Sequence, residues 1–185
     1  MISPLFKSLL DNSMFLIPLE MDNEENPLEG GEMESFLRTE NTAKPQFKLQ
    51  LDDKDVNFED LEDLLEYPRL NTVGELWLDR NEFGNKGVEL LSIAEQLSGL
   101  RVLSLAGNKL TDHALSTLAN SKALSELKRL FIQNNFLGSK GVTDLAQSQV
   151  ITSLEILYLK QNPLRIDGAK ALANSCAFKD MKELY

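Results

Sequence analysis

The residue types that perform catalysis are scarce in this chain, and their spacing keeps them apart. The sequence has one histidine, His113, and one cysteine, Cys176. Nucleophilic catalysis needs a nucleophile beside a base, but we expect His113 at the surface, in a turn before a helix, and Cys176 packed on a distant helix. Asp52 and Asp53 are adjacent, so a strand would point them to opposite faces. The sequence therefore predicts no catalytic residues, no metal site and no cofactor.

Leucines at a constant interval organise the rest of the chain. With Leu103 as the reference, equivalent leucines recur every 27 residues. They are Leu49, Leu76, Leu103, Leu130, Leu157 and Leu184. Within a unit the apolar residues first alternate, as at Leu103 and Leu105, and then follow helical spacing, as at Leu115 and Leu118. Each unit is therefore predicted to be a short strand followed by a helix.

Two further columns recur with the same period, and both favour a structural explanation. A small residue precedes each helical face where neighbouring helices would approach closely, at Gly87, Ala114, Gly141 and Gly168. An asparagine follows the strand in four units, at Asn81, Asn108, Asn135 and Asn162. A carboxamide has both donors and acceptors, so it can satisfy backbone groups of its own unit and of the adjacent one. We expect a ladder of asparagines inside the stack.

These residues resemble the ribonuclease-inhibitor type of leucine-rich repeat. The pattern L-x-x-L-x-L-x-x-N-x-L-G-x-x-G-x-x-x-L-A is nearly complete from Leu127 to Ala146, and Leu154 to Ala173 matches it with Arg165 in place of the first glycine. The resemblance covers residues 47–185. It implies a right-handed α/β solenoid shaped as a horseshoe, with a parallel β-sheet on the concave side and α-helices on the convex side.

The resemblance also sets expectations about function. The class includes ribonuclease inhibitors, sensor domains of innate immune receptors, GTPase-activating proteins of the Ran type, and bacterial proteins including secreted effectors. The uniform 27-residue unit is more similar to the short bacterial arrays. A Ran-type activity would use an arginine or asparagine at a repeat turn, for which Arg80 and Arg129 are the candidates.

One column of the predicted concave face is rich in aromatic residues. The position between the two strand leucines is occupied by Gln50, Trp77, Ser104, Phe131, Tyr158 and Tyr185. Because successive strands lie about 4.8 Å apart, these side chains should form a row. A row of exposed aromatic residues is typical of a contact site, but aromatic neighbours on a sheet also pack on one another. Both interpretations remain open. Charged residues that could orient a partner flank the row: Asp52, Asp79, Arg129 and Lys160.

The N-terminal residues 1–46 lack clear repeats. A short helix is expected over residues 3–10 and an irregular strand over 15–21, and residues 19–46 are interpreted as a degenerate repeat that caps the solenoid. An acidic disordered tail is the alternative, because this segment has nine acidic and three basic residues. The protein has a net charge of −10 and no basic stripe, which disfavours nucleic acid and membrane as partners.

The sequence therefore predicts a capping segment over 1–46 and a leucine-rich-repeat domain over 47–185, with five full repeats and a sixth strand. Its expected function is non-catalytic binding of a protein partner on the concave face, and the resemblance to bacterial arrays suggests a bacterial effector acting on host proteins. The alternatives are a self-assembling repeat protein with end-to-end contacts or a fragment of a larger one, and, less favoured, a Ran-type GTPase-activating protein. A single cysteine and the lack of a signal-peptide pattern favour a cytoplasmic location. Export into a host cell without a cleavable signal is the other possibility.

Overall fold

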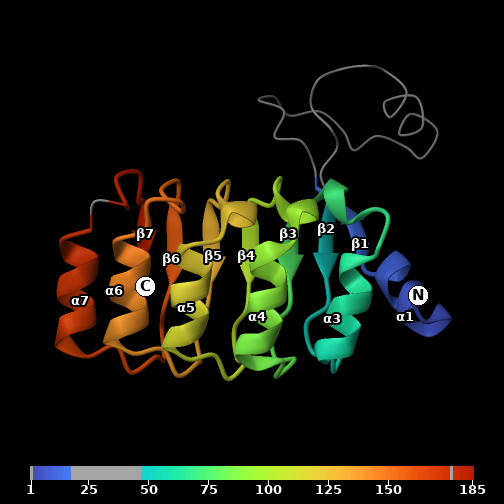
Figure 1. Cartoon of the computed structure of the whole chain (residues 1–185), viewed down its shortest axis with the longest axis horizontal. Coiled ribbons are helices and arrows are strands. Elements are labelled where there is room, and N and C mark those ends of the chain that lie inside the picture. Colours follow the sequence, from blue (N-terminus) through green and yellow to red (C-terminus); the bar gives the residue numbers. More distant parts are fainter. Residues whose placement is uncertain (1, 18–46, 176) are drawn as a thin grey trace, which may run out of the picture.

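The computed structural model describes residues 2–17, 47–175 and 177–185, and it confirms the predicted α/β solenoid. Seven strands in this part of the chain form one sheet in sequence order (Figure 1). They are β1 (Met14–Leu16), β2 (Phe47–Gln50), β3 (Val73–Trp77), β4 (Val102–Ser104), β5 (Arg129–Phe131), β6 (Ile156–Tyr158) and β7 (Glu183–Leu184). The strands from β2 to β7 pair in parallel.

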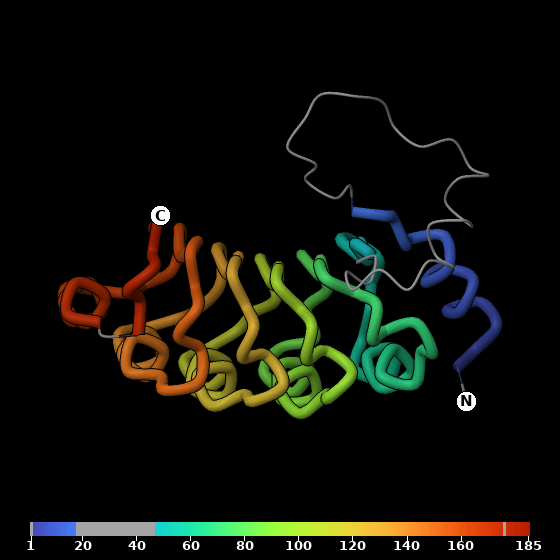
Figure 2. The backbone as a smooth tube through the Cα atoms, turned by 90° about the horizontal axis from the view of Figure 1, so that it is seen from above, coloured from blue at the N-terminus to red at the C-terminus, as the bar shows by residue number. Residues whose placement is uncertain are grey.

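The helices follow the strands and lie on one side of the sheet. They are α3 (Phe58–Leu65), α4 (Gly84–Ile93), α5 (Asp112–Ala119), α6 (Ser139–Ala146) and α7 (Arg165–Ala173). Figure 2 shows the helices along the outside of a curve and the strands along its inside. Short 3-10 turns over Leu70–Thr72, Glu95–Leu97 and Lys122–Leu124 bring the chain back from a helix to the next strand.

The recurring leucines fill the space between the sheet and the helices. In the sheet Leu76 pairs with Leu103 and Leu103 with Leu130, so the 27-residue period is also the register of the strands. All three side chains are completely inaccessible to solvent. Burying one leucine side chain contributes about 1.5–3 kcal/mol to the free energy of folding. Because an equivalent leucine is buried in each repeat, this contribution recurs along one continuous core.

The small residues before the helical faces lie where neighbouring repeats touch. A Cβ atom added at Gly141 in α6 would lie 2.7 Å from the Cα atom of Asp112, in the backbone of α5. A Cβ atom at Gly87 in α4 would lie 2.4 Å from the ring of Phe83, at the start of the same helix, and 2.7 Å from Cδ1 of Leu61 in α3. A side chain at Gly141 would push α6 away from α5, and one at Gly87 would require the side chains of Phe83 and Leu61 to move.

The first strand differs from the repeats because it covers the edge of the sheet. β1 runs antiparallel to β2, with Met14 opposite Leu49. It follows α1 (Pro4–Asn12), in which the hydroxyl of Ser3 accepts a hydrogen bond from the amide of Phe6. β1 begins one residue earlier than the strand expected over 15–21, and residues 18–21 of that expectation lie outside the described ranges. The degenerate repeat expected over 19–46 falls entirely on residues outside the described ranges.

One buried tyrosine joins this N-terminal element to the first repeat. The hydroxyl of Tyr67 donates a hydrogen bond of 2.5 Å to Oδ1 of Asp11 at the end of α1. Burial of the phenol, together with this hydrogen bond to Asp11, raises the pKa of Tyr67 to about 12.

Candidate partner-binding surface

The register of the strands brings the aromatic column into a row on the open side of the sheet. Trp77 is paired with Ser104, Ser104 with Phe131, and Phe131 with Tyr158. Because Ser104 is small, the rings of Trp77 and Phe131 stack across it with their centroids 5.5 Å apart, and Ser104 is completely buried. Two residues from non-adjacent repeats are thereby in contact.

The stacking continues to the last described strand. The centroids of Phe131 and Tyr158 are 5.1 Å apart, and those of Tyr158 and Tyr185 are 4.3 Å apart. We call these four residues, Trp77, Phe131, Tyr158 and Tyr185, the aromatic stripe. Its first three members are partly buried and Tyr185 is half exposed. The rings therefore pack on one another and also remain accessible, so the two interpretations of this column are compatible.

Polar groups fix both ends of the aromatic stripe. The ammonium group of Lys48 lies 4.4 Å from the ring centroid of Trp77, at a distance typical of a cation–π contact. The indole N–H of Trp77 donates to Glu75 at 3.2 Å. At the other end the hydroxyl of Tyr185 donates to Glu183 at 3.2 Å, and this hydrogen bond raises the pKa of Tyr185.

The two aspartates of the candidate site are held by hydrogen bonds within the protein. Asp52 accepts the backbone N–H of Asp79 at 2.8 Å. Asp79 accepts the hydroxyl of Ser104 at 2.5 Å and the backbone N–H of Ala106 at 2.9 Å, and only 9% of its surface is exposed. Burial raises the pKa of Asp79, although both hydrogen bonds oppose the shift. Each aspartate thus accepts a hydrogen bond from a backbone N–H group of the next repeat.

The two cations of the candidate site have a different environment. Arg129 in β5 and Lys160, which follows β6, are exposed. Among the residues that the structure describes, neither side chain makes a hydrogen bond or an ion pair. Glu155, the acidic residue next to β6, is taken by Lys182 at 2.6 Å and has Lys128 at 3.9 Å. The hydrogen bond from Lys182 lowers the pKa of Glu155.

The asparagine column forms a ladder of hydrogen bonds behind the strands. Oδ1 of Asn108 accepts the backbone N–H groups of Asn81 and Glu82, both at 2.9 Å, and its amide donates to the carbonyl of Leu78 at 2.8 Å. Asn135 accepts the N–H of Asn108 in the same manner at 2.9 Å. The ladder fixes the turn after each strand, and therefore the direction in which the strand presents its side chains.

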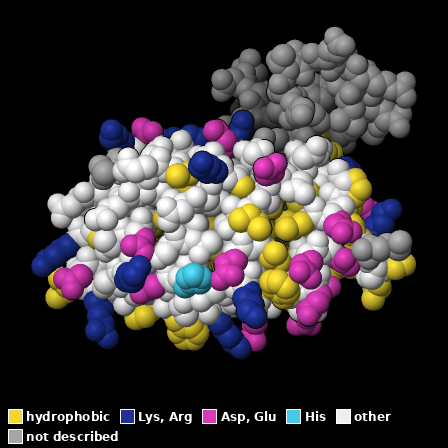
Figure 3. Space-filling model, in the orientation of Figure 1, with side chains coloured by type: hydrophobic (Ala, Val, Ile, Leu, Met, Phe, Trp, Pro, Cys, Tyr) yellow, Lys and Arg dark blue, Asp and Glu magenta, His cyan; other side chains and the backbone are white. Residues whose placement is uncertain are grey.

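Among the residues that the structure describes, His113 and Arg80 lie apart and each is engaged with a carboxylate. His113 lies in the first turn of α5 rather than before the helix, and its Nε2 atom is 2.8 Å from Glu89 on the exposed helical side. Arg80 is paired with Asp53 through two hydrogen bonds of 2.7 and 2.5 Å. Cys176 falls outside the described residues. Figure 3 shows acidic and basic side chains interspersed over the helical side.

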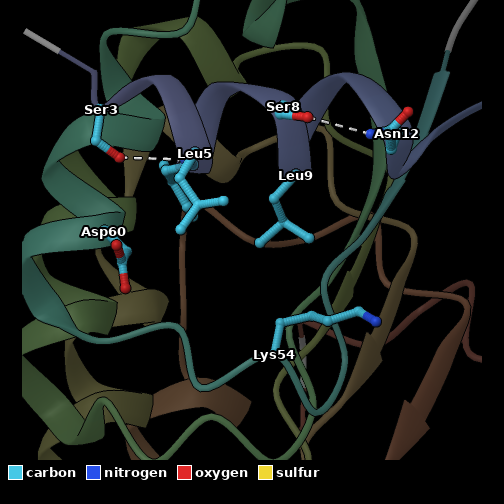
Figure 4. A pocket seen from close by; sticks show the side chains of 8 residues that line it. Ser3, Leu5, Ser8, Leu9, Asn12, Lys54 and Asp60 are labelled. Carbon is cyan, nitrogen blue, oxygen red and sulfur yellow. Dashed lines mark hydrogen bonds between the residues drawn. The ribbon is translucent and has the colours of Figure 1, made fainter.

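A pocket beside α1 also lacks convergent free polar groups. It lies between α1, Lys54 and Asp60, with Leu5 and Leu9 pointing into it (Figure 4). The carboxylate of Asp60 closes a capping box with Asn57 at the start of α3, so it is engaged in helix capping. Among described residues, no group of acidic, histidine or cysteine side chains could hold a metal ion, and no helix could span a membrane.

Sequence reasoning missed three features of this surface. It did not assign Ser104 its role as the gap across which Trp77 and Phe131 stack. It did not pair Lys48 with Trp77, although both lie in columns that the repeat defines. Outside the strands, it missed Phe136, which directly follows Asn135 and is 64% exposed, because the equivalent positions of the other repeats are not aromatic.

Comparisons with known proteins identify a match for one of the repeat units. A family model described as Leucine Rich repeat matches residues 98–119. No curated protein matches the sequence.

Solved structures that are similar to this chain include the following three, all at low identity. Actin-Binding Site 2 of Leiomodin-1 is 15% identical, with a TM-score of 0.46 over 68% of this chain and 79% of the other. The tropomodulin C-terminal domain of Caenorhabditis elegans is 15% identical, with a TM-score of 0.44 over 63% and 90%. An internalin from Listeria monocytogenes is 19% identical, with a TM-score of 0.38 over 72% and 38%.

These structural likenesses are weak, so the assignment depends on the repeat itself. The matched segment contains β4 and α5, and its strand pairs in register with equivalent strands on both sides. The stacked units therefore have the architecture of a leucine-rich-repeat solenoid, and the family model matches the unit that contains β4 and α5.

Proposed function

We propose that this protein is a non-catalytic interaction module that binds a protein partner on its concave face. The observation that carries the proposal is the aromatic stripe, in which four rings from separate strands lie in one row and remain partly accessible. Tryptophan and tyrosine are among the residues that contribute most to the energy of protein interfaces. Rings already ordered by stacking lose little side-chain entropy when a partner binds.

The charged residues of the candidate site take separate parts in this proposal. Arg129 and Lys160 are available to a partner because they are exposed. Asp52 and Asp79 are engaged in hydrogen bonds with the backbone of the next repeat, so their contribution is to hold the surface in shape. The finer expectation of a bacterial effector acting on host proteins derives from the sequence resemblance alone, and identification of the partner would test it.

The test compares variants of the two faces as baits. Trp77→Ala with Tyr158→Ala removes two rings of the aromatic stripe. The control, Ile93→Ala with Ile166→Ala, removes two side chains of the helical side that are 73% and 72% exposed. We expect a partner captured by the unmodified chain and by the control to be lost with the concave variant. Retention of every partner by a concave variant that still folds, as judged by circular dichroism, would refute the proposal.

Self-association is a second candidate, supported by the last described strand. β7 is paired with β6 alone among the described strands, and Leu184 and Tyr185 are 48% and 50% exposed. An open strand edge with apolar side chains can pair with another chain. Light scattering of the protein at several concentrations tests this candidate: a mass that rises with concentration supports it, and a constant monomer mass excludes it.

A further inference from the structure

The stacking of the aromatic stripe determines which parts of its rings a partner can reach. Phe131 is covered on one side by Trp77 and on the other by Tyr158, and Tyr158 lies in the same way between Phe131 and Tyr185. Each inner ring therefore has an aromatic neighbour on both sides, stacked in the contacts with Trp77 and Tyr185 and tilted by 38° in the contact between Phe131 and Tyr158. What remains accessible is the ring edge, which carries partial positive charge, whereas the face carries partial negative charge.

Two exposed cations, Arg129 and Lys160, lie beside the inner rings of the stripe. Four acidic side chains near the stripe accept hydrogen bonds within the protein: Asp52 and Asp79 from backbone N–H groups, Glu75 from Trp77 and Glu183 from Tyr185. Arg129 and Lys160 are exposed, and within the described ranges their side chains have no hydrogen-bond or ion-pair partner. Arg129 also attracts Glu155, whose pKa is lowered mainly by the hydrogen bond from Lys182 and in part by the charge of Arg129. A protein with a net charge of −10 thus presents two exposed cations beside the inner rings.

The register of the strands places these two cations on opposite sides of the stripe. Phe131 is paired with Tyr158; Arg129 precedes Phe131 by two residues, and Lys160 follows Tyr158 by two. At about 3.3 Å per residue along a strand and about 4.8 Å between strands, their Cα atoms are roughly 14 Å apart. Four residues of an extended chain span about 13 Å, so carboxylates at positions i and i+4 of a partner would reach both cations.

We propose that the C-terminal half of the concave face binds an extended acidic segment of its protein partner, with two carboxylates four residues apart and an apolar side chain midway between them. The carboxylates pair with Arg129 and Lys160, and the apolar side chain lies on the edges of Phe131 and Tyr158. This inference rests on the proposed function, and it adds the chemical class of the partner.

The test uses the full chain and a library of eleven-residue peptides with Glu at positions 4 and 8 and Leu at position 6. Two matched libraries carry Gln or Lys in place of both Glu residues. Binding is followed by the fluorescence of Trp77, the only tryptophan, which lies in the stripe. We expect binders in the Glu library alone, and a loss of affinity of about threefold each in Arg129→Gln and Lys160→Gln. The control Lys86→Gln makes the same charge change on α4 and should have no effect.

The outcomes separate this inference from the proposed function. Equal binding of the Gln or Lys library, or no binding from any library, overturns the acidic segment. If capture of a protein partner then still depends on Trp77 and Tyr158, the proposed function stands while this inference falls. If neither the stripe nor the two cations affect partner or peptide, both fall.

Discussion

Trp77 and Phe131 are two repeats apart in sequence, yet their rings stack at 5.5 Å across the buried side chain of Ser104. The contact spans three successive strands of the concave face, β3, β4 and β5. Ser104, on the middle strand, also donates a hydrogen bond from its hydroxyl to Asp79. A small residue in the middle of an aromatic column thus makes the row continuous instead of interrupting it.

The stack should be measurable as a coupling between the two rings. In a double-mutant cycle of Trp77→Ala and Phe131→Ala, we expect a coupling of about 1 kcal/mol in the free energy of unfolding. The comparison pair, Trp77 and Tyr185, occupies the two ends of the stripe and should show almost no coupling. Urea denaturation of the single and double variants gives both values. Equal coupling in the two cycles would contradict the stacking.

Asn108 should be among the polar side chains that contribute most to stability. Asn108→Ala leaves the N–H groups of Asn81 and Glu82 and the carbonyl of Leu78 without their partner. At about 1–3 kcal/mol for each buried unpaired group, we expect a loss of about 3 kcal/mol or more in urea denaturation. Asn162→Ala is the matched control, because Asn162 is only partly buried and water can replace its hydrogen bonds. A larger loss at Asn162 would contradict the ladder.

Gly141 should not tolerate a methyl group. Its Cβ atom would lie 2.7 Å from the Cα atom of Asp112 and 2.9 Å from the Asp112 carbonyl oxygen, and both are backbone atoms that cannot rotate away. We expect Gly141→Ala to lower the free energy of unfolding by about 1–3 kcal/mol, as overpacked cores do. Gly99→Ala has open space around the added Cβ atom and should change stability little. Thermal denaturation of both variants decides, and equal melting temperatures would contradict the close approach.

The sequence predicts the periodic features of this fold well, because burial and backbone pairing recur with every repeat. The leucines of the core could be named from their spacing, since each one meets its equivalent in the next strand. The environment of Asp79 could not be predicted, because its burial depends on Ser104 and Ala106 one repeat away. The antiparallel β1 has no periodic signal, because it occurs once.

Asp79 and Asp53 should affect the pH dependence of stability in opposite directions. Burial raises the pKa of Asp79 above its usual 3.8, so the native chain binds more protons than the unfolded chain between 3.8 and the raised value, and stability falls as pH rises through that window. The hydrogen bond from Arg80 lowers the pKa of Asp53, and the resulting stability is present above 3.8 and lost as pH falls through the lowered value.

Asparagine variants measure these two contributions. Relative to the unmodified chain, Asp79→Asn should gain stability on going from pH 3 to pH 7, whereas Asp53→Asn should lose stability over the same range. Urea denaturation at several pH values gives both trends. Trends of the same sign in the two variants would show that Asp79 is not held as a buried carboxyl.

Photo-crosslinking from single positions tests the concave face most directly. A benzoylphenylalanine at Gln50, the exposed first residue of the aromatic column, should crosslink to a protein partner in extracts of the source cells. The same group at Ile93, exposed on α4, should not crosslink to that partner. Efficient crosslinking from Ile93 with none from Gln50 would contradict binding on the concave face.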